Sequence, residues 1–482
     1  MTAMSSRRPA ASGAVRMPQR MPLRMPLRMP LRMPLRIWQR IWQRISVVGL
    51  WLSIGLQSAW AAEPYDIAPL VPARVVDARY FATHLHRLVA VAEPQARATP
   101  WPVGQIGALR LWDSTTRWAD LEPSRGTFVF DRLDAYVAQA QSQGVTLLMV
   151  LGSSARWAAA RPDEPGPYGP GSASEPASLA DWERYVTVLA RRYKGRIEAY
   201  ELWNEPYFSD LPADRGHPSA FFTGSVATMV ELARRTRAVL EREDPQARLL
   251  TPGFVGGVER LDRFLHAGGG RYADGVAYHF YADDDREFIK LHRAVRAVMA
   301  RHGVSRLPLY NTESGFAADD APGPRAGTSL DRTTAAIQLA RSMVLGAFLG
   351  IDRFYQYAWD NGRSGMLNPG SLNATASAGA FAAVRRWLLG TTLRGCRLES
   401  DGSVRCEGSR GGNQLLIVWQ ASAAQPVVMR LAETLRAVSV DRAIDPQRPP
   451  DLSAVLASGL VVGADPVAVW WRPAAAGKGA AQ

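Results

Sequence analysis

The chain has 482 residues, 47% of them hydrophobic, and a formal net charge of +13 at pH 7. This length and apolar content predict one large domain together with a small one. Residues 1–62 contain ten arginines and no acidic residue, so the rest of the chain carries only +3. The body of the chain is nearly balanced in charge, which argues against nucleic acid as a partner.

The N-terminal segment, residues 1–61, has the pattern of an export signal. Its arginines precede a mostly apolar run at 45–56, and small residues follow around Ala59 and Ala61. Basic, apolar and small-residue regions in this order are typical of a secretory signal peptide. The apolar run is short for a bilayer-spanning helix, which needs about 20 residues. We expect cleavage near Ala61, no stable membrane insertion afterwards, and a periplasmic or secreted protein; an uncleaved membrane anchor is the alternative.

After a linker at residues 62–78, strand-like and helix-like segments alternate. The expected strands are 79–86, 106–113, 145–152, 197–205, 248–254, 275–281, 307–315 and 351–360. The expected helices are 131–144, 178–194, 219–243, 285–302, 330–349 and 376–389. Such alternation indicates parallel βαβ units, and eight strands predict an α/β fold, a (β/α)8 TIM barrel over residues 79–390. A doubly wound open sheet is the alternative, but no Gly-x-Gly-x-x-Gly turn follows the first strand.

The pattern changes after the last helix. Residues 391–472 are short, β-rich and interrupted by turns, which predicts a small C-terminal β-sandwich-like domain, and residues 473–482 have the composition of a disordered tail. The two cysteines of the chain, Cys396 and Cys406, are ten residues apart. In an exported protein we expect them to form a disulfide across a hairpin, with two free thiols as the alternative.

Two glutamates follow predicted strands. Glu205 stands in Trp-Asn-Glu-Pro after the fourth strand, and Glu313 stands in Thr-Glu-Ser-Gly after the seventh. A barrel brings the C-terminal ends of its strands to one mouth, where active sites lie. Two carboxyl groups facing one sugar are what glycoside hydrolysis needs, one as acid and base and the other as nucleophile or base. Two unrelated surface carboxylates are the alternative.

These two motifs resemble those of clan A of the retaining glycoside hydrolases. Within the clan the chain is most similar to family 39, in its PslG-like branch associated with exopolysaccharide loci. The resemblance implies Glu205 as acid/base, Glu313 as nucleophile and Asn204 as donor to the sugar 2-hydroxyl. It implies cleavage of a β-linked poly- or oligosaccharide, within the chain, with retention and without a cofactor. Retention requires the two carboxyl groups to lie roughly 5–5.5 Å apart.

Further candidate sugar contacts lie on other strand ends, where residues two apart share a face. They are His84, His86, Arg110, Trp157, His279, Tyr281, Trp359 and Asp360. Arg110 and Tyr281 are also expected to keep Glu313 ionised, and Glu201 is expected to pair with an arginine inside the barrel. Packing in the barrel interior is the alternative for the histidines and for Trp359.

Two other functions fit the same barrel. One is a catalytically idle carbohydrate-binding or scaffolding protein of a polysaccharide export system. The other is a metal-dependent hydrolase that uses His84 and His86, but later strand ends offer few further ligands beyond His279. We therefore expect no metal, a carbohydrate partner and a monomer, and we predict neither the sugar nor the linkage.

Overall fold

The computed structural model describes residues 65–89, 98–217, 220–318, 330–421, 425–430, 436–444 and 451–472. The predicted signal segment and the predicted tail lie outside the described residues. Glu63 to Gln482 form one compact unit. Within the described ranges, no helix combines the length and the hydropathy needed to cross a membrane.

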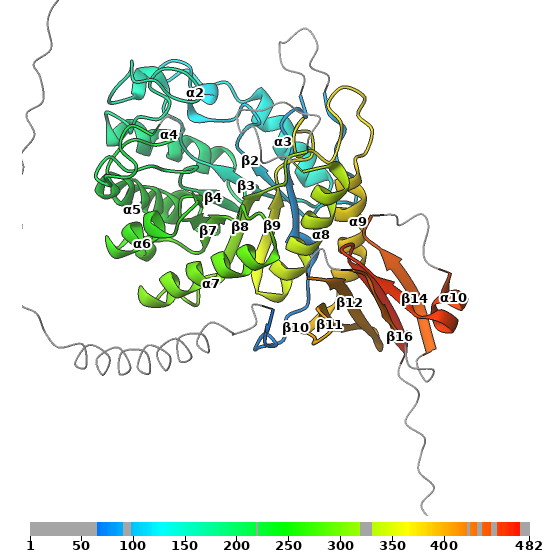
Figure 1. The fold of residues 1–482 in the computed structure, drawn as a ribbon. Coiled ribbons are helices and arrows are strands. Elements are labelled where there is room, and N and C mark those ends of the chain that lie inside the picture. The colour runs from blue at the N-terminus through cyan, green and yellow to red at the C-terminus, as the bar shows by residue number, and fades with distance from the viewer. Residues whose placement is uncertain are drawn as a thin grey trace, which may run out of the picture. The chain divides into compact units, whose positions relative to one another are not determined.

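A parallel sheet of nine described strands forms the centre of the larger domain, in the order β5-β4-β3-β2-β1-β9-β8-β7-β6 (Figure 1). The strands are β1 Phe81–His84, β2 Ala108–Leu111, β3 Thr146–Val150, β4 Ala199–Glu201, β5 Arg248–Leu250, β6 Phe254–Val255, β7 Val276–His279, β8 Leu309–Ser314 and β9 Ile351–Gln356. A parallel bridge between Leu250 and Gly275 closes the ring. β5 and β6 are the two halves of the predicted fifth strand, separated at Pro252, which has no N–H to donate. The predicted (β/α)8 barrel is confirmed.

Helices surround these strands in Figure 1. They are α2 Trp118–Leu121, α3 Asp131–Ser142, α4 Leu179–Arg192, α5 Val226–Glu243, α6 Glu259–His266, α7 Asp285–Arg301, α8 Arg332–Phe348 and α9 Ala376–Leu388, with 3₁₀ turns η2 Ala78–Tyr80, η3 Arg156–Ala158 and η4 Gly269–Tyr272. The predicted helix from 219 begins too early, because the Ser225 side chain caps α5 by accepting from the Thr228 N–H. The residues before this cap instead cover Trp203, whose indole N–H donates to the Phe221 carbonyl.

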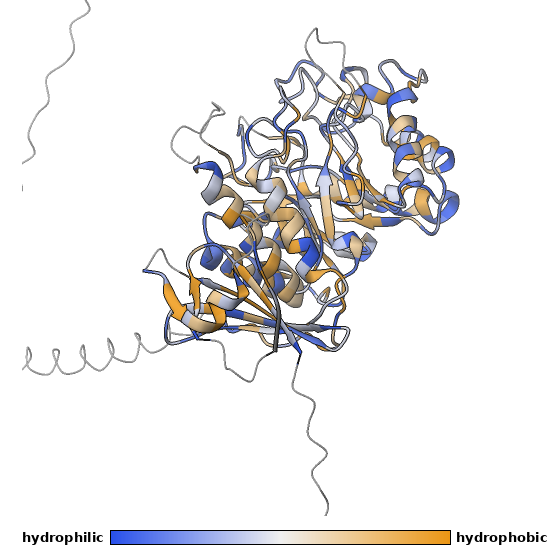
Figure 2. Ribbon diagram, turned by 90° about the vertical axis from the view of Figure 1, so that its right-hand side faces the viewer, coloured by the Kyte–Doolittle hydropathy of each residue, from blue (hydrophilic) through white to orange (hydrophobic). Residues whose placement is uncertain are grey.

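The barrel interior has an apolar layer below a polar one. The apolar layer takes one described residue from each of eight strands, namely Ala82, Ala108, Leu148, Ala199, Leu250, Ala277, Tyr310 and Tyr355. Two positions further along their strands stand His84, Arg110, Glu201 and His279, which share the inward face because strand side chains alternate. In Figure 2 hydrophobic residues are frequent along the strands, whereas hydrophilic residues are frequent on the helices. The polar layer lies toward the C-terminal strand ends, where the two glutamates follow.

The C-terminal domain is built from antiparallel strands, in a sheet of order β10-β11-β12-β16-β14 and a smaller β13-β15 pair. Its elements are β10 Thr392–Leu398, β11 Ser403–Arg410, β12 Asn413–Gln420, β13 Val427–Met429, β14 Arg436–Arg442, α10 Leu452–Ser458, β15 Leu460–Val462 and β16 Val467–Arg472. Cys396 and Cys406 stand opposite each other on β10 and β11 and are joined by the predicted hairpin disulfide. The predicted linker also belongs to this domain's edge, since Ile67 and Val75 form antiparallel bridges with β10.

Candidate active site

Glu205 is held at the barrel mouth by its backbone and by a histidine. Its φ of +40° is rare for a residue with a side chain, and its N–H donates to the Gly253 carbonyl at 2.9 Å. Its Oε1 atom lies 2.8 Å from Nδ1 of His279, at the end of β7. The Glu205 side chain is 18% exposed. The carboxyl group therefore faces the barrel on one side and solvent on the other.

His279 is fully buried, and its environment fixes which ring nitrogen carries the proton. Burial lowers the pKa of His279 to about 4, so the ring is neutral at neutral pH. Nε2 lies 3.5 Å from Nη2 of Arg110, whose two hydrogens are donated to Glu201 and Asn204, so a lone pair on Nε2, and not an N–H, is favoured beside this positive charge. Nδ1 then carries the hydrogen and donates it to Oε1 of Glu205.

Glu313 is buried and receives two strong hydrogen bonds. Nη1 of Arg110 donates to Oε2 at 2.8 Å, and the Tyr281 hydroxyl donates to Oε1 at 2.8 Å. Burial raises the pKa of the Glu313 carboxyl, and the positive charge of Arg110 acts against that rise. Tyr281 as a whole is 39% exposed, but desolvation of its hydroxyl and the negative charge of Glu313 raise its pKa well above the ordinary value, so the hydroxyl remains a donor. Both donors stabilise the carboxylate form of Glu313.

Arg110 joins four side chains of the site. It is fully buried and donates from Nε and Nη2 to the two oxygens of Glu201, at 3.0 and 2.7 Å. Nη2 also donates to Oδ1 of Asn204 at 2.7 Å. The predicted pairing of Glu201 with an interior arginine is confirmed. Because the Asn204 oxygen is engaged, the donor that this amide offers to a sugar is its NH2 group.

A β-bulge brings Glu313 into the barrel. Along the β7–β8 pair, Tyr278 is opposite Asn311 but His279 is opposite Glu313, so Thr312 is an extra residue in β8. Tyr310 faces the interior, and strict alternation would next turn Thr312 inward and Glu313 outward. The extra residue shifts this phase and places Glu313 beside His279.

One oxygen of Glu205, one oxygen of Glu313 and one nitrogen of His279 lie within 4.8 Å of one another. By distance alone these three groups could hold a metal ion. The cationic Arg110 guanidinium, however, is bonded to Glu313 and faces His279, and it would repel a divalent cation at this point. The arrangement is better suited to proton transfer between two carboxyl groups and a bound molecule.

The two histidines of the first strand surround an aromatic ring that the sequence did not single out. His84 is fully buried, and its Nε2 donates to the Thr312 carbonyl at 3.1 Å. The side chain of His86 is 13% exposed. Both rings pack against Tyr357. The centroid of its ring lies 5.0 Å from that of His84 and 5.1 Å from that of His86. His84 thus supports the backbone beside Glu313, and direct sugar contact by His86 stays a prediction.

Three other predicted contacts lie elsewhere. Trp359 is 9% exposed, and its indole N–H donates to the Pro100 carbonyl. The Asp360 side chain is fully buried and accepts from the backbone N–H groups of His86 and Arg87. The predicted sugar contact of Asp360 is therefore corrected to a structural role, whereas that of Trp359 stays a prediction. Trp157 donates to the Glu122 carbonyl, and its role as a sugar contact stays a prediction.

Asp113, Tyr168 and Tyr357 form a cluster that sequence reasoning missed. Asp113 follows β2, and the hydroxyls of Tyr168 and Tyr357 donate to its two oxygens. A signal was present, since Asp113 is an acidic residue directly after a predicted strand, as Glu205 and Glu313 are. The tyrosines come from loops after other strands, and nothing in the sequence links them to Asp113.

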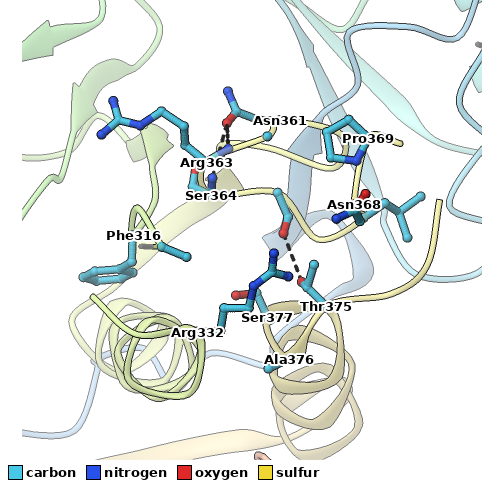
Figure 3. A pocket seen from close by; sticks show the side chains of 14 residues that line it. Phe316, Arg332, Asn361, Arg363, Ser364, Asn368, Pro369, Thr375, Ala376 and Ser377 are labelled. Atoms are coloured by element: carbon cyan, nitrogen blue, oxygen red, sulfur yellow. Dashed lines mark hydrogen bonds between the residues drawn. The ribbon is translucent and has the colours of Figure 1, made fainter. Parts of the chain in front are cut away.

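A solvent-open hollow of about 390 Å³ lies between the loops after β8 and β9 and the first residues of α8 and α9. Figure 3 shows Phe316 on one side of this hollow and Pro369 on the other, with polar side chains between them. Ser364 lines it and donates to the Tyr357 carbonyl at 2.6 Å. The two glutamates do not line this hollow, but Tyr357 connects it to their surroundings, because its N–H donates to the carbonyl of Ser314, the residue after Glu313.

No family model matches the chain. An endo-1,4-beta-xylanase of Agaricus bisporus is 25% identical over 185 residues, which are 36% of this chain and about half, 49%, of the relative. A family 39 glycoside hydrolase from the gut symbiont Bacteroides cellulosilyticus WH2 superposes with a TM-score of 0.57 at 17% identity, over 76% of each chain. A GH30 endoxylanase from Clostridium papyrosolvens C71 superposes with a TM-score of 0.54 at 11% identity, over 83% of this chain and 98% of that one.

At these identities the structural likeness shows the fold. All three similar proteins are glycoside hydrolases, so the predicted resemblance to clan A is confirmed, and they support the predicted enzyme class, a glycosidase.

Proposed function

We propose that the protein is a retaining glycosidase that hydrolyses a β-linked poly- or oligosaccharide by double displacement, with Glu313 as nucleophile and Glu205 as acid/base. The observation that carries the proposal is the close approach of the two carboxyl groups, which have oxygens within 4.8 Å of each other. Retaining enzymes need a separation of roughly 5–5.5 Å between the groups, whereas inverting enzymes need roughly 6.5–9.5 Å to admit a water.

The contacts of each carboxyl group suit its proposed step. In the first step Glu313 attacks the anomeric carbon and forms an ester with the sugar. The bond to the leaving oxygen breaks, and Glu205 gives that oxygen its proton. In the second step Glu205 takes a proton from water, whose oxygen attacks the anomeric carbon and releases Glu313. The sum is addition of one water across the glycosidic bond.

The neighbouring side chains assist these steps without changing their own protonation. Arg110 and Tyr281 stabilise the negative charge of Glu313 before attack and after release. The neutral His279 donates to Oε1 of Glu205 and so orients the carboxyl group at the barrel mouth. The NH2 group of Asn204 is placed to donate to the sugar hydroxyl next to the reacting carbon.

Cleavage within a polysaccharide chain, with an exopolysaccharide as substrate, is the narrower form of the proposal. The names of an endo-xylanase relative and of a GH30 endoxylanase neighbour favour chain-internal cleavage. The hollow beside Tyr357 offers polar groups for a further sugar unit.

Export to the periplasm or the medium is part of the same proposal, and cell fractionation with an antibody against the C-terminal domain would test it.

The deciding experiment incubates the purified protein with defined β-linked oligosaccharides and follows the first product by NMR. We expect the β-anomer to form first. Glu205→Gln and Glu313→Gln should each lose at least roughly 10³-fold in kcat, whereas Glu259→Gln, at a 64% exposed side chain, should not. An α-anomer as first product contradicts the double displacement. Binding without hydrolysis by the unaltered protein favours the idle carbohydrate-binding alternative.

A further inference from the structure

A third carboxylate stands next to the two proposed catalytic ones. Asp113 lies three residues beyond Arg110 on the same strand end and is partly exposed. Tyr168 donates to Oδ1 and Tyr357 donates to Oδ2, so each oxygen of Asp113 holds one hydroxyl. Burial and the negative charge of Asp113 raise the pKa of both tyrosines far above the ordinary value, so both remain donors. Asp113 thus accepts both hydroxyl hydrogen bonds, and an aspartate ordinarily carries a negative charge at neutral pH.

This anion is tied to the nucleophile through Tyr357. The Tyr357 N–H donates to the Ser314 carbonyl at 2.8 Å, and its ring packs on His84, which bonds the Thr312 carbonyl. The residues on both sides of Glu313 are thus connected to the ring that Asp113 holds. After burial, the negative charge of Asp113 is among the causes that raise the pKa of Glu313. Asp113 therefore lies on the strand end that carries Arg110, which bonds Glu313, and it is joined through Tyr357 to the residue after Glu313.

Negative charge exceeds positive charge among the described residues of these contacts. Arg110 is shared between the carboxylates of Glu201 and Glu313. Arg117 lies over the Tyr168 ring at 3.9 Å, but it is already paired with Asp120 at 2.8 Å. The buried histidines add no charge, because burial lowers the pKa of His84 and His279 below the ordinary value. The two cations of these contacts, Arg110 and Arg117, are therefore each paired with a carboxylate, whereas Arg332 and Arg363 line the neighbouring hollow.

We propose that Asp113 is a specificity-determining residue that selects an uncharged sugar at the cleavage site and rejects a uronate. The proposal rests on the glycosidase function proposed above and names the substrate class of that site. A sugar hydroxyl can donate to an Asp113 oxygen, whereas a sugar carboxylate meets a like charge in a cleft that water screens poorly. Repulsion at such distances is sufficient for roughly 100-fold discrimination.

The test compares cellotetraose with the β-1,4-linked tetraglucuronate that differs from it in carrying carboxylates at C6. kcat/KM is measured at pH 7 and low salt, and Kd is measured by calorimetry in a Glu205→Gln background. We expect the neutral tetrasaccharide to be favoured roughly 100-fold and Asp113→Asn to reduce this ratio about tenfold. The matched control is Asp163→Asn, since the Asp163 side chain is 80% exposed and outside the cluster; its ratio should equal that of the unaltered protein.

A second readout needs no variant. If charge repulsion causes the preference, 1 M NaCl should reduce the ratio, because its screening length is only about 3 Å. An unchanged ratio in Asp113→Asn, a ratio insensitive to salt, or equal binding of both tetrasaccharides each overturns the specificity proposal alone. Discrimination in binding without hydrolysis contradicts the proposed hydrolysis alone. Binding of neither tetrasaccharide counts against both.

Discussion

Arg110 is the residue on which the geometry of the site depends. It is fully buried, and the N–H groups of its planar guanidinium group donate hydrogen bonds to Glu201, Asn204 and Glu313. A lysine has one point charge and could not hold three partners in this fashion. The pattern of the sequence placed Arg110 on a strand end but could not show that all three contacts converge on it.

Replacing Arg110 with Met should cost about 3–5 kcal/mol of the free energy of unfolding, because it leaves Glu201 buried and unpaired. Denaturant unfolding measures this cost. The double variant Arg110→Met with Glu201→Leu should recover most of the stability but none of the activity, since Glu313 still lacks its donor. Equal instability of the single and double variants would contradict this account of the pair.

Gly253 is a second residue whose role only the structure reveals. It follows the interruption at Pro252, and a Cβ atom on it would lie 2.3 Å from Oε1 of Glu201 and 2.5 Å from Nε2 of His279. Its backbone also accepts from the Glu205 N–H. The absence of a side chain lets this segment approach the polar layer of the barrel.

Gly253→Ala should therefore displace His279 and Glu205 and lower kcat by at least roughly 100-fold. Gly257→Ala is the matched control, because a Cβ there has no atom within 4 Å. Steady-state kinetics on the same oligosaccharide measure both variants. Full activity in Gly253→Ala would show that the site tolerates a shift of these side chains.

At the scale of elements, the inward faces of the barrel strands change from apolar to polar toward their C-terminal ends. The alternation of strands and helices was readable because buried parallel strands are continuous apolar runs. Its exceptions were not readable: the bulge at Thr312 depends on the pairing of β7 with β8, and the late start of α5 depends on the packing over Trp203.

Helix α7 carries a pH-sensitive group remote from the site. His292 is 5% exposed, and neither ring nitrogen has a hydrogen-bond partner among the residues that the structure describes. Burial, with Arg296 and Arg293 nearby, lowers the pKa of His292 to about 3. The unfolded chain binds a proton at this residue near pH 6.5, whereas the folded chain does not until about pH 3. Its contribution to stability is therefore complete above pH 6.5 and is lost as the pH falls toward 3.

Between pH 7 and pH 5 this one residue should reduce the free energy of unfolding by about 2 kcal/mol. In His292→Leu the decrease measured by urea unfolding at the two pH values should be smaller by that amount, while hydrolytic activity stays the same. Equal decreases in both proteins would mean that the folded protein protonates His292 near its ordinary pKa.

At the scale of the whole molecule, a buried arginine contacts both the barrel and the C-terminal domain. Arg341 of α8 donates to the carbonyls of Gln420 and Ala464 and pairs with Asp285 at 3.4 Å. The Trp419 indole N–H also donates to Asp285, which is 2% exposed. The two domains thus share a buried polar contact, and we expect them to unfold as a unit.

Arg341→Met should lower stability by about 3–5 kcal/mol, because it leaves Asp285 buried without its cation, and calorimetry should then resolve two transitions. Arg386→Met is the control: this arginine also reaches the C-terminal domain, at Asp441, but its side chain is 48% exposed and its pair is worth little. A single unshifted transition in Arg341→Met would mean that the apolar contacts between the domains suffice.

The sequence by itself determined the (β/α)8 barrel, the C-terminal β-domain, the hairpin disulfide and the two glutamates, because each depends on local periodicity or on position relative to a strand end. The resemblance to clan A glycoside hydrolases followed from the same short motifs. The tertiary structure decided which side chains meet. It turned Glu313 inward through a bulge, directed Asp360 into a structural role, and joined Asp113 to two tyrosines from distant loops. These outcomes depend on contacts between segments far apart in the chain, about which local patterns carry no information.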